Sequence, residues 1–447
     1  MNAQALSVAR AALGRELTRV SVGAIGIRAA GAAFGFLFNI VLARSLGREG
    51  TGTVMFYLNF GTMVGLVATA GMDVVGLREL SRLENDRLRA ESVFAQILCN
   101  ALISSSLFSV LGLAILLRFG ASLAGAADAE ICVASALILF LTSFQKSCSD
   151  WLIGIHEFAA SQLVFFFINR VLSLALLVAA LVLIGARAEL FILIYAIGLF
   201  LAVLFGTTRI VAHFSWRRIM DKVAPSLPLF RDGVSCGIQN AAFIALNLSP
   251  FVLLGALSNT SQIGLFGVSQ RLVALMVLTL TTVSQFAMRD FARASGQREF
   301  GTLARTLTVS VRLTFAAAVP LTVGLVAFAP LWISVFGRAF AGAEATLALL
   351  ACAICAQCLG MPFQSALLAT NHERSARDVT LVCAAVGVAL NVFLIPRWGA
   401  EGAAIGTGVG LALQSLGHAI RVLSLLPVRL HLAGLRFVPA QIAEAES

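Results

Sequence analysis

The chain has 447 residues, 59% of them hydrophobic and only 12% charged, and its mean hydropathy is +0.93. Soluble domains carry about 25% charged residues, so this composition excludes a soluble globular protein and indicates an integral membrane protein. The net charge of +10 would suggest a nucleic-acid partner in a soluble chain. Here it is typical of arginines gathered on the cytoplasmic side of a membrane, and we expect no nucleic acid.

The first apolar segment, residues 34–79, contains two long runs joined by a short turn rich in arginine and glycine at 43–53. Each run has about 20 residues, enough to cross a hydrocarbon core of about 30 Å at about 1.5 Å per residue. The pattern predicts a transmembrane helical hairpin. Residues 1–19 predict an uncleaved cytoplasmic end, because no short apolar core with a cleavage site follows them.

Hydropathy along the whole chain predicts twelve spans of this kind. In chain order they cover 19–43, 53–77, 93–117, 130–147, 160–186, 189–208, 233–257, 263–288, 306–329, 344–369, 376–396 and 400–424. We therefore expect an all-α integral membrane protein with two six-helix bundles, at 1–210 and 233–424. A cytoplasmic linker at 211–232 and a cytoplasmic tail at 425–447 complete the predicted organisation. Within the tail, residues 427–438 predict an interfacial helix that contacts anionic lipid.

Basic residues between the predicted spans are shared unequally between the two sides of the membrane. One set of segments, which includes both termini and counts Lys146 as a loop residue, holds 22 of the 32 Arg and Lys residues. The alternate set holds 6. Cytoplasmic segments carry the excess of Arg and Lys in multi-pass proteins, so the split predicts that both termini are cytoplasmic.

Small and helix-breaking residues recur inside the spans. Glycines at intervals of four residues occupy one face of the first and last spans, at Gly31, Gly35, Gly402, Gly406 and Gly410. This spacing lets helix backbones approach closely in lipid, so these faces are predicted to pack against other helices. A proline can interrupt the hydrogen bonds of a span, and three lie inside spans, at Pro250, Pro320 and Pro362.

Arginines inside the spans call for a reason, because one at the bilayer centre costs about 2.5–3.5 kcal/mol on insertion scales. Arg28, Arg170 and Arg271 each lie about nine residues into a span, near the midplane at about 1.5 Å per residue. One interpretation is a cationic central cavity, in which the planar guanidinium forks bind a phosphate. The other is snorkelling or pairing with backbone carbonyls, which is favoured for Arg312 near the cytoplasmic surface.

Amide side chains within the spans, at Asn169, Asn240 and Gln270, are candidate contacts for sugar hydroxyls. The alternative is a hydrogen bond from one helix to another, which is favoured for any single amide. Carboxylates are nearly absent from the spans. Asp73, near the end of the second span, is interpreted as the interfacial partner of an ion pair.

No catalytic constellation or cofactor motif is visible in the sequence. The five histidines fall at span ends or in the tail, and there is no Gly-Lys-Ser/Thr phosphate loop. Cys352, Cys355 and Cys358 share a helix face, but no histidine or carboxylate lies near them in sequence. They are interpreted as small packing residues, so no metal is expected. The sequence predicts a transporter without a cofactor, and not an enzyme.

Two hairpins carry a resemblance to a known family. VLARSLG at 41–47, followed by Gly50, Gly52 and GMD at 71–73, resembles the opening hairpin of the polysaccharide-transporter (O-antigen flippase) family. NVFLIPRWG at 391–399, continued by GAAIG at 402–406, resembles the last hairpin of that family. The resemblance implies a fold similar to that of the multidrug and toxin extrusion transporters.

The same resemblance implies a function. It implies flipping of an undecaprenyl-diphosphate-linked oligosaccharide across the bacterial inner membrane for O-antigen or exopolysaccharide biosynthesis. The implied partners are this substrate, membrane lipids and the polysaccharide polymerase or export machinery.

Two other functions remain open. A cation-coupled multidrug or small-molecule antiporter of the same fold would need a titratable acid in the central cavity, and the sequence offers no candidate there. A membrane polymerase or acyltransferase would need acid–base residues and usually a sizeable external loop, and the predicted external loops are all short.

Overall fold

The computed structural model describes residues 3–83, 86–124, 128–183, 185, 187–296, 300–370 and 372–426, and within these ranges the chain is helical and contains no strand. The elements are α1 (Ala3–Ala68), α2 (Met72–Arg82), α3 (Arg87–Ala124), α4 (Ala129–Gly154), α5 (Phe158–Gln162), the π-helix η1 (Leu163–Ile168), α6 (Asn169–Leu183), α7 (Ala188–His213), α8 (Trp216–Met220), α9 (Leu227–Leu257), α10 (Thr260–Gly296), α11 (Phe300–Ala327), α12 (Ala329–Ser334), the 3-10 helix η2 (Arg338–Phe340), α13 (Glu344–Ala369) and α14 (Glu373–Leu425).

Nine helices among the described residues are long and apolar enough to cross a bilayer. Lipid offers no hydrogen-bond partner, so a chain this apolar satisfies its backbone N–H and C=O groups within helices. Two of the nine contain a glycine with positive φ, Gly47 (66°) in α1 and Gly399 (54°) in α14, and each is therefore two helices joined at that glycine. The two halves of α1, the two halves of α14, the other seven candidate spans and α10, which covers the predicted span 263–288, together follow the twelve predicted spans in order.

The helices are interrupted at glycines and not at prolines. α9, α11 and α13 continue through Pro250, Pro320 and Pro362, so the prolines do not break the helices as the sequence suggested they could. At Gly47 and Gly399 the chain reverses through a backbone conformation that glycine adopts without a Cβ clash.

The second predicted span, 53–77, is not continuous. α1 ends at Ala68, the turn that follows contains Ala70 (φ 47°) and Gly71 (φ 76°), and α2 begins at Met72. Space also requires glycine at this turn, since a Cβ on Gly71 would lie 1.9 Å from the carbonyl oxygen of Gly233. α2 then packs against α4, which places its first turn inside the helix bundle.

The fourth predicted span was also wrong at its end. α4 continues to Gly154 instead of stopping at residue 147. Lys146, counted above as a cytoplasmic loop residue, therefore lies within a buried helix of the bundle.

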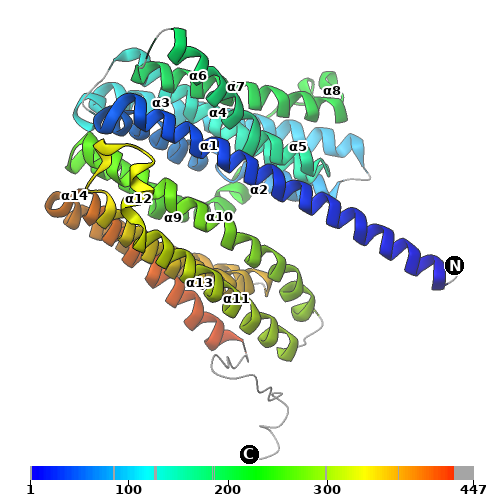
Figure 1. Ribbon diagram of the computed structural model, residues 1–447. Helices are drawn as coiled ribbons and strands as arrows, with labels where there is room; N and C mark the ends of the chain where they lie inside the picture. The colour runs from blue at the N-terminus through cyan, green and yellow to red at the C-terminus, as the bar shows by residue number, and fades with distance from the viewer. Residues whose placement is uncertain are drawn as a thin grey trace, which may run out of the picture. The chain divides into compact units, whose positions relative to one another are not determined.

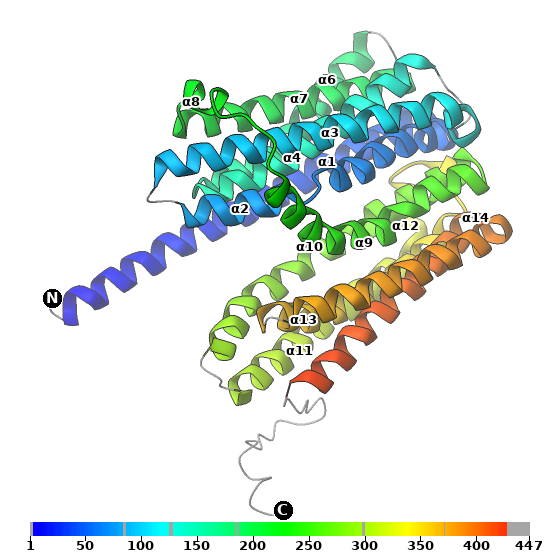
Figure 2. The ribbon, with the colours of Figure 1, turned by 180° about the vertical axis from the view of Figure 1, so that it is seen from behind.

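Contacts divide the chain into two compact units, Met1–Ile244 and Ala245–Ser447. In the first unit α4 packs against α1, α2, α3 and α7, and the long helices α1, α3, α4 and α7 lie side by side (Figure 1, Figure 2). In the second unit α13 contacts α10, α11 and α14. α9 carries the chain from the first unit into the second. The domain limits predicted at residues 210, 232 and 424 stay a prediction, and the predicted interfacial helix at 427–438 lies outside the described residues.

Each unit has its own core of apolar side chains. In the first, Trp151 is buried against Phe94 with ring centroids 5.2 Å apart, and Phe214 stacks on the same Phe94 at 5.4 Å.

In the second unit, the glycine face of the last span packs against the part of α14 that precedes Gly399. A Cβ on Gly406 would lie 2.2 Å from the Oδ1 of Asn391. The close packing predicted for this face is thereby confirmed.

Candidate functional site

Two of the predicted cationic residues, Arg28 of α1 and Arg170 of α6, meet at one aromatic ring in the first unit. The Cζ atom of Arg28 lies 5.0 Å from the ring centroid of Phe166, and that of Arg170 lies 5.6 Å from it. Both distances are within the range of a cation–π interaction. Arg28 also donates a 2.6 Å hydrogen bond from Nε to the Oε1 of Gln162. Arg28 and Arg170, from helices far apart in the chain, thus form one site, which we call the arginine pair.

The arginine pair is built on a π-helical segment, η1. A π-helical turn takes backbone carbonyls out of the α-helical register, and such turns are frequent at functional sites. Two carbonyls of η1 accept hydrogen bonds of 2.8 Å from side chains, that of Val164 from the Nε2 of Gln145 and that of Phe166 from the Nη1 of Arg170. Within the described part of the chain, Arg170 contacts no carboxylate, so its charge is not neutralised there.

The glycine face of α1 brings these elements together. A Cβ on Gly31 would lie 2.0 Å from the carbonyl oxygen of Phe166, and a Cβ on Gly35 would lie 2.9 Å from the Cδ of Arg170. The close approach predicted from the spacing of these glycines is confirmed, and its partner is the segment that carries Arg170. The glycines therefore position the arginine pair, a connection that the sequence alone did not reveal.

The predicted sugar contacts are placed differently from one another. Asn169 is buried, and its Oδ1 accepts a 2.9 Å hydrogen bond from Ser173 on its own helix. A Cβ on Gly198 of α7 would lie 2.6 Å from the same Oδ1, so this placement favours the packing role of Asn169. Asn240 is exposed on α9. A role for either residue in sugar binding stays a prediction.

The remaining candidates lie in the second unit, on α10 and α11. Gln270 is half-buried and donates from Nε2 to the carbonyl of Asn247 at 3.2 Å, a bond between α10 and α9. Arg271 is half-buried beside it, and Arg312 is half-buried on α11. Their proposed roles stay predictions.

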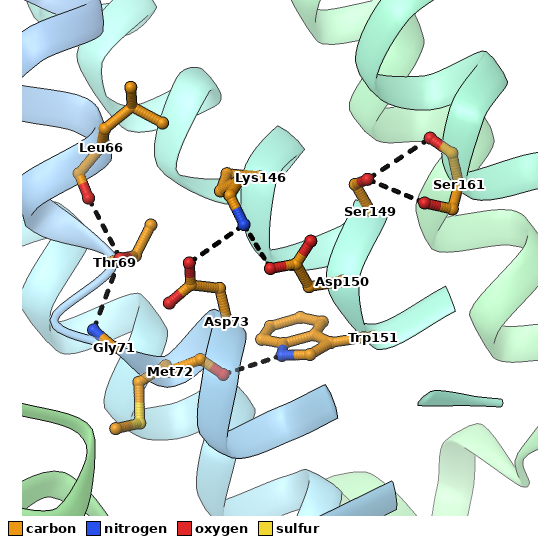
Figure 3. A network of polar contacts seen from close by, with 10 residues as sticks. All are labelled: Leu66, Thr69, Gly71, Met72, Asp73, Lys146, Ser149, Asp150, Trp151 and Ser161. Atoms are coloured by element: carbon orange, nitrogen blue, oxygen red, sulfur yellow. Dashed lines mark hydrogen bonds and ion pairs between the residues drawn. The ribbon is translucent and has the colours of Figure 1, made fainter. Parts of the chain in front are cut away.

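A second polar cluster, which sequence reasoning missed, surrounds Lys146 in the first unit (Figure 3). The Nζ of Lys146 forms ion pairs with Asp150, one helical turn later on α4, and with the Oδ2 of Asp73 at 3.2 Å. Asp73 is only 2% exposed, and its Oδ1 has no hydrogen-bond partner among the described residues. We call these three residues the lysine triad.

The lysine triad bears on the interpretation of Asp73. The predicted ion pair is present, its partner is Lys146 of α4, and the Asp73 carboxylate is buried within the first unit. Asp150, the second carboxylate, lies beyond the predicted end of the fourth span at residue 147. One feature of the sequence could have revealed part of the lysine triad. Lys146 and Asp150 are four residues apart in an apolar segment, and side chains at this spacing face each other on a helix.

A third charged cluster joins the turn after α4 to the end of α7. Glu157 accepts hydrogen bonds of 2.9 and 2.8 Å from Arg209 and lies 3.1 Å from the Nε2 of His213. The hydrogen bonds from Arg209, and secondarily from His213, lower the pKa of Glu157 below its ordinary value. These side chains are partly exposed, so the cluster fixes the turn and is not part of the arginine pair.

Comparison with known proteins identifies relatives of the chain. The family described as polysaccharide biosynthesis protein matches residues 24–288, which is more than half of the chain. The probable flippase AglR of Haloferax volcanii is 26% identical over 175 residues, 38% of this chain and 37% of that protein. The probable low-salt glycan biosynthesis flippase Agl15 of the same organism is 23% identical over 178 residues, 40% of this chain and 38% of that protein. The chain thus matches less than half the length of these curated relatives.

Solved structures share the fold. An inward-facing multidrug resistance MATE family transporter of the MOP superfamily superposes with a TM-score of 0.70 at 15% identity, over 88% of this chain and 95% of that one. The lipid II flippase MurJ, in an inward closed conformation, superposes with a TM-score of 0.69 at 12% identity, over 91% of this chain and 87% of that one. The expected fold, similar to that of multidrug and toxin extrusion transporters, is confirmed.

Proposed function

This chain belongs to the polysaccharide biosynthesis protein family, and from that premise we propose that it is a flippase that moves a lipid-linked oligosaccharide across the membrane for glycan biosynthesis. The names of its two Haloferax relatives and the shared fold with a lipid II flippase support the class of transport. In its finer form the proposal takes undecaprenyl diphosphate as the lipid carrier and an O-antigen or exopolysaccharide as the product. The membrane is then the bacterial inner membrane, with both termini in the cytoplasm.

The observation that carries the proposal is the arginine pair at Phe166. A lipid-linked oligosaccharide presents a diphosphate between its sugars and its lipid, and two guanidinium groups offer it planar, permanently charged hydrogen-bond donors. Arg170 has no carboxylate partner among the described residues, so an entering anion does not have to displace one. The lipid tail of such a substrate can stay in the bilayer while the head group follows a polar path.

The second candidate function is a cation-coupled antiporter for small molecules. The buried carboxylate of Asp73 in the lysine triad favours it, since such coupling requires an acid within the bundle. The positive charge of the arginine pair opposes it for cationic drugs, because a low surrounding dielectric strengthens repulsion between like charges.

The two candidates are separated by deleting the protein from a strain that keeps its glycan pathway. The flippase proposal expects lipid-linked oligosaccharide to accumulate on the cytoplasmic leaflet and the surface polysaccharide to disappear, with tolerance of cationic dyes unchanged. Extraction of lipid-linked sugars, surface glycan staining and dye sensitivity are measured in the same strain, with the wild-type chain returned as the control. Normal surface glycan together with marked dye hypersensitivity would overturn the flippase proposal.

A further inference from the structure

The segment that joins α7 to α9, residues 214–226, is fastened to α3, and we call it the connector. Near its start, the buried carboxylate of Glu91 on α3 accepts a 3.0 Å hydrogen bond from the backbone N–H of Ser215 and forms a 3.2 Å ion pair with Arg218. Ile219, in the short helix α8, is fully buried in the core of the first unit. Figure 2 shows the connector passing over α3, so its position along that helix is fixed.

The end of the connector is fastened to the same helix at a greater depth. The buried amide of Asn100 on α3 accepts from the N–H of Ser226 at 3.2 Å and donates to the carbonyl of Ser226 at 2.9 Å. Asn100 lies nine residues beyond Glu91, about 13 Å along the helix, and inside the predicted span 93–117. A backbone in water needs no such partner, whereas one at the edge of a bilayer does. The contacts therefore indicate that the connector enters the headgroup layer beside α3.

The connector and the start of α9 turn apolar side chains outward. Trp216 and Met220, one helical turn apart on α8, are 45% and 50% exposed, and Leu227, the first residue of α9, is 77% exposed. Arg217 and Lys222 lie among them in sequence and are exposed as well. A tryptophan and other apolar side chains beside basic ones are typical of segments that lie in the membrane interface.

The charge of this surface distinguishes one class of lipid from another. Arg218 is paired with Glu91, but neither Arg217 nor Lys222 forms an ion pair with a described residue. Arg231, exposed one turn into α9, adds another positive charge, and Asp221 is the one acidic residue of the connector. The exposed charge is therefore positive, and it favours a lipid with a net negative headgroup over a zwitterionic one.

We propose that the connector is a binding surface for anionic phospholipid. Arg217 and Lys222 contact the phosphate of the headgroup, while Trp216, Met220 and Leu227 enter the boundary between headgroups and acyl chains. The bound lipid holds the start of α9 at the bilayer surface, in the leaflet where α3 begins and α7 ends. This role does not depend on the proposed flippase activity, since it concerns the surrounding lipid and not the transported one.

Trp216 can report contact with lipid directly. The chain has 4 tryptophans, and replacing Trp332 and Trp398 by phenylalanine leaves Trp216 and the buried Trp151. Trp216→Phe in this background measures the contribution of Trp151, which is subtracted. The purified full-length protein is placed in vesicles of equal amounts of phosphatidylglycerol and phosphatidylcholine, with bromine on the acyl chains of one lipid or the other. Bromine quenches a tryptophan that it touches, so the headgroup composition stays constant and only the quenching lipid changes.

We expect phosphatidylglycerol to quench Trp216 in preference to phosphatidylcholine, with a ratio of binding constants on the order of tenfold. The ratio should fall to about one in the double variant Arg217→Gln/Lys222→Gln. Arg338→Gln/Arg397→Gln is the matched control, since it removes two exposed positive charges outside the connector and should keep the preference. The preference of the parent should also shrink in about 1 M salt, where the screening length is about 3 Å.

Several outcomes would overturn the lipid surface. Equal quenching by the two lipids in the parent would remove the preference for anionic headgroups. Quenching by neither would place Trp216 away from the bilayer and leave this face to a protein partner or a second copy of the chain. A preference lost equally in both double variants would assign it to the overall charge of the protein. If Arg217→Gln/Lys222→Gln does not fold, a preference in the parent that is unchanged by salt would overturn the proposal on its own.

Discussion

Arg170 donates a 2.8 Å hydrogen bond from its Nη1 to the carbonyl oxygen of Phe166, the residue four positions earlier in the π-helical segment. The bond helps to explain how an arginine is tolerated there, because it gives the guanidinium a hydrogen-bond acceptor inside the protein. It occupies one nitrogen of the guanidinium, which has five N–H donors, so the side chain can hold its own helix and still offer donors to a ligand. The two interpretations of this arginine, pairing with a carbonyl and binding an anion, are therefore compatible.

Replacing Arg170 by alanine should lower transport while the protein still inserts. A charge-assisted hydrogen bond to the substrate contributes about 1.5–3 kcal/mol, so we expect a decrease of about 10- to 100-fold in the rate at low substrate concentration. Arg170→Lys should restore part of the rate, because an ammonium offers a point charge and not a planar fork. The measurement is translocation of lipid-linked oligosaccharide, normalised to the amount of protein in the membrane.

The matched control for this experiment is Arg312→Ala on α11, where the sequence favours snorkelling. Its transport rate should stay near that of the parent. Unchanged transport in both Arg170→Ala and Arg28→Ala would contradict the role of the arginine pair in binding the substrate. These two side chains would then have a structural role.

The cluster at Glu157 predicts a pH-dependent contribution to stability. Hydrogen bonds from Arg209 and His213 lower the pKa of Glu157, so its carboxylate stabilises the fold above the unfolded-state pKa of about 4.3. That contribution disappears as the pH falls through the lower, folded-state pKa. Because the partners are partly exposed and screened by solvent, we expect Glu157→Gln to cost only about 0.5–1 kcal/mol at neutral pH.

The measurement is the apparent Tm of Glu157→Gln and of the parent, at neutral pH and at strongly acidic pH. The gap between them should be present at neutral pH and should close in acid. Asp221→Asn, at an exposed aspartate that follows α8, serves as the control and should show no gap. A gap that widens in acid would contradict the sign of the linkage.

Two glycines with positive φ should differ in their tolerance of alanine. Gly47 (φ 66°) has open space around the position of a Cβ, so Gly47→Ala should cost only the backbone strain of about 1–2 kcal/mol. At Gly71 (φ 76°) the same Cβ would also lie 1.9 Å from the carbonyl oxygen of Gly233. Gly71→Ala should therefore be the more destabilising substitution, as measured by the Tm and the yield of folded protein in detergent. Equal effects would show that the turn at Gly71 can move away from α9.

The orientation in the membrane can be tested by cysteine labelling in a background without the 8 native cysteines. Asn259→Cys, exposed between α9 and α10, should react with an impermeant thiol reagent added to intact cells. Ala224→Cys, exposed between α8 and α9, should react only after lysis, because its segment carries part of the cytoplasmic excess of arginine and lysine. The opposite pattern would reverse the predicted topology.

The sequence by itself determined the class of the protein and the order of its helices. Its apolar runs are long enough to cross a bilayer, and in lipid a backbone has few ways to satisfy its polar groups other than a helix. The spacing of Gly31 and Gly35 likewise predicted close helix packing, because a missing Cβ permits close approach whatever the partner is. Arg28 and Arg170 stood out individually, since each is a charge inside an apolar run.

Only the tertiary structure decided which of these residues meet. The partner of Arg28 lies 134 positions away at Gln162, and hydropathy carries no information about such a pairing. The turn at Gly71 was hidden because its neighbours are as apolar as a continuous span, and the need for glycine arises from the carbonyl of Gly233 on another helix. The burial of Asp73 was also hidden, because the sequence does not show that α4 supplies the lysine that pairs with this carboxylate.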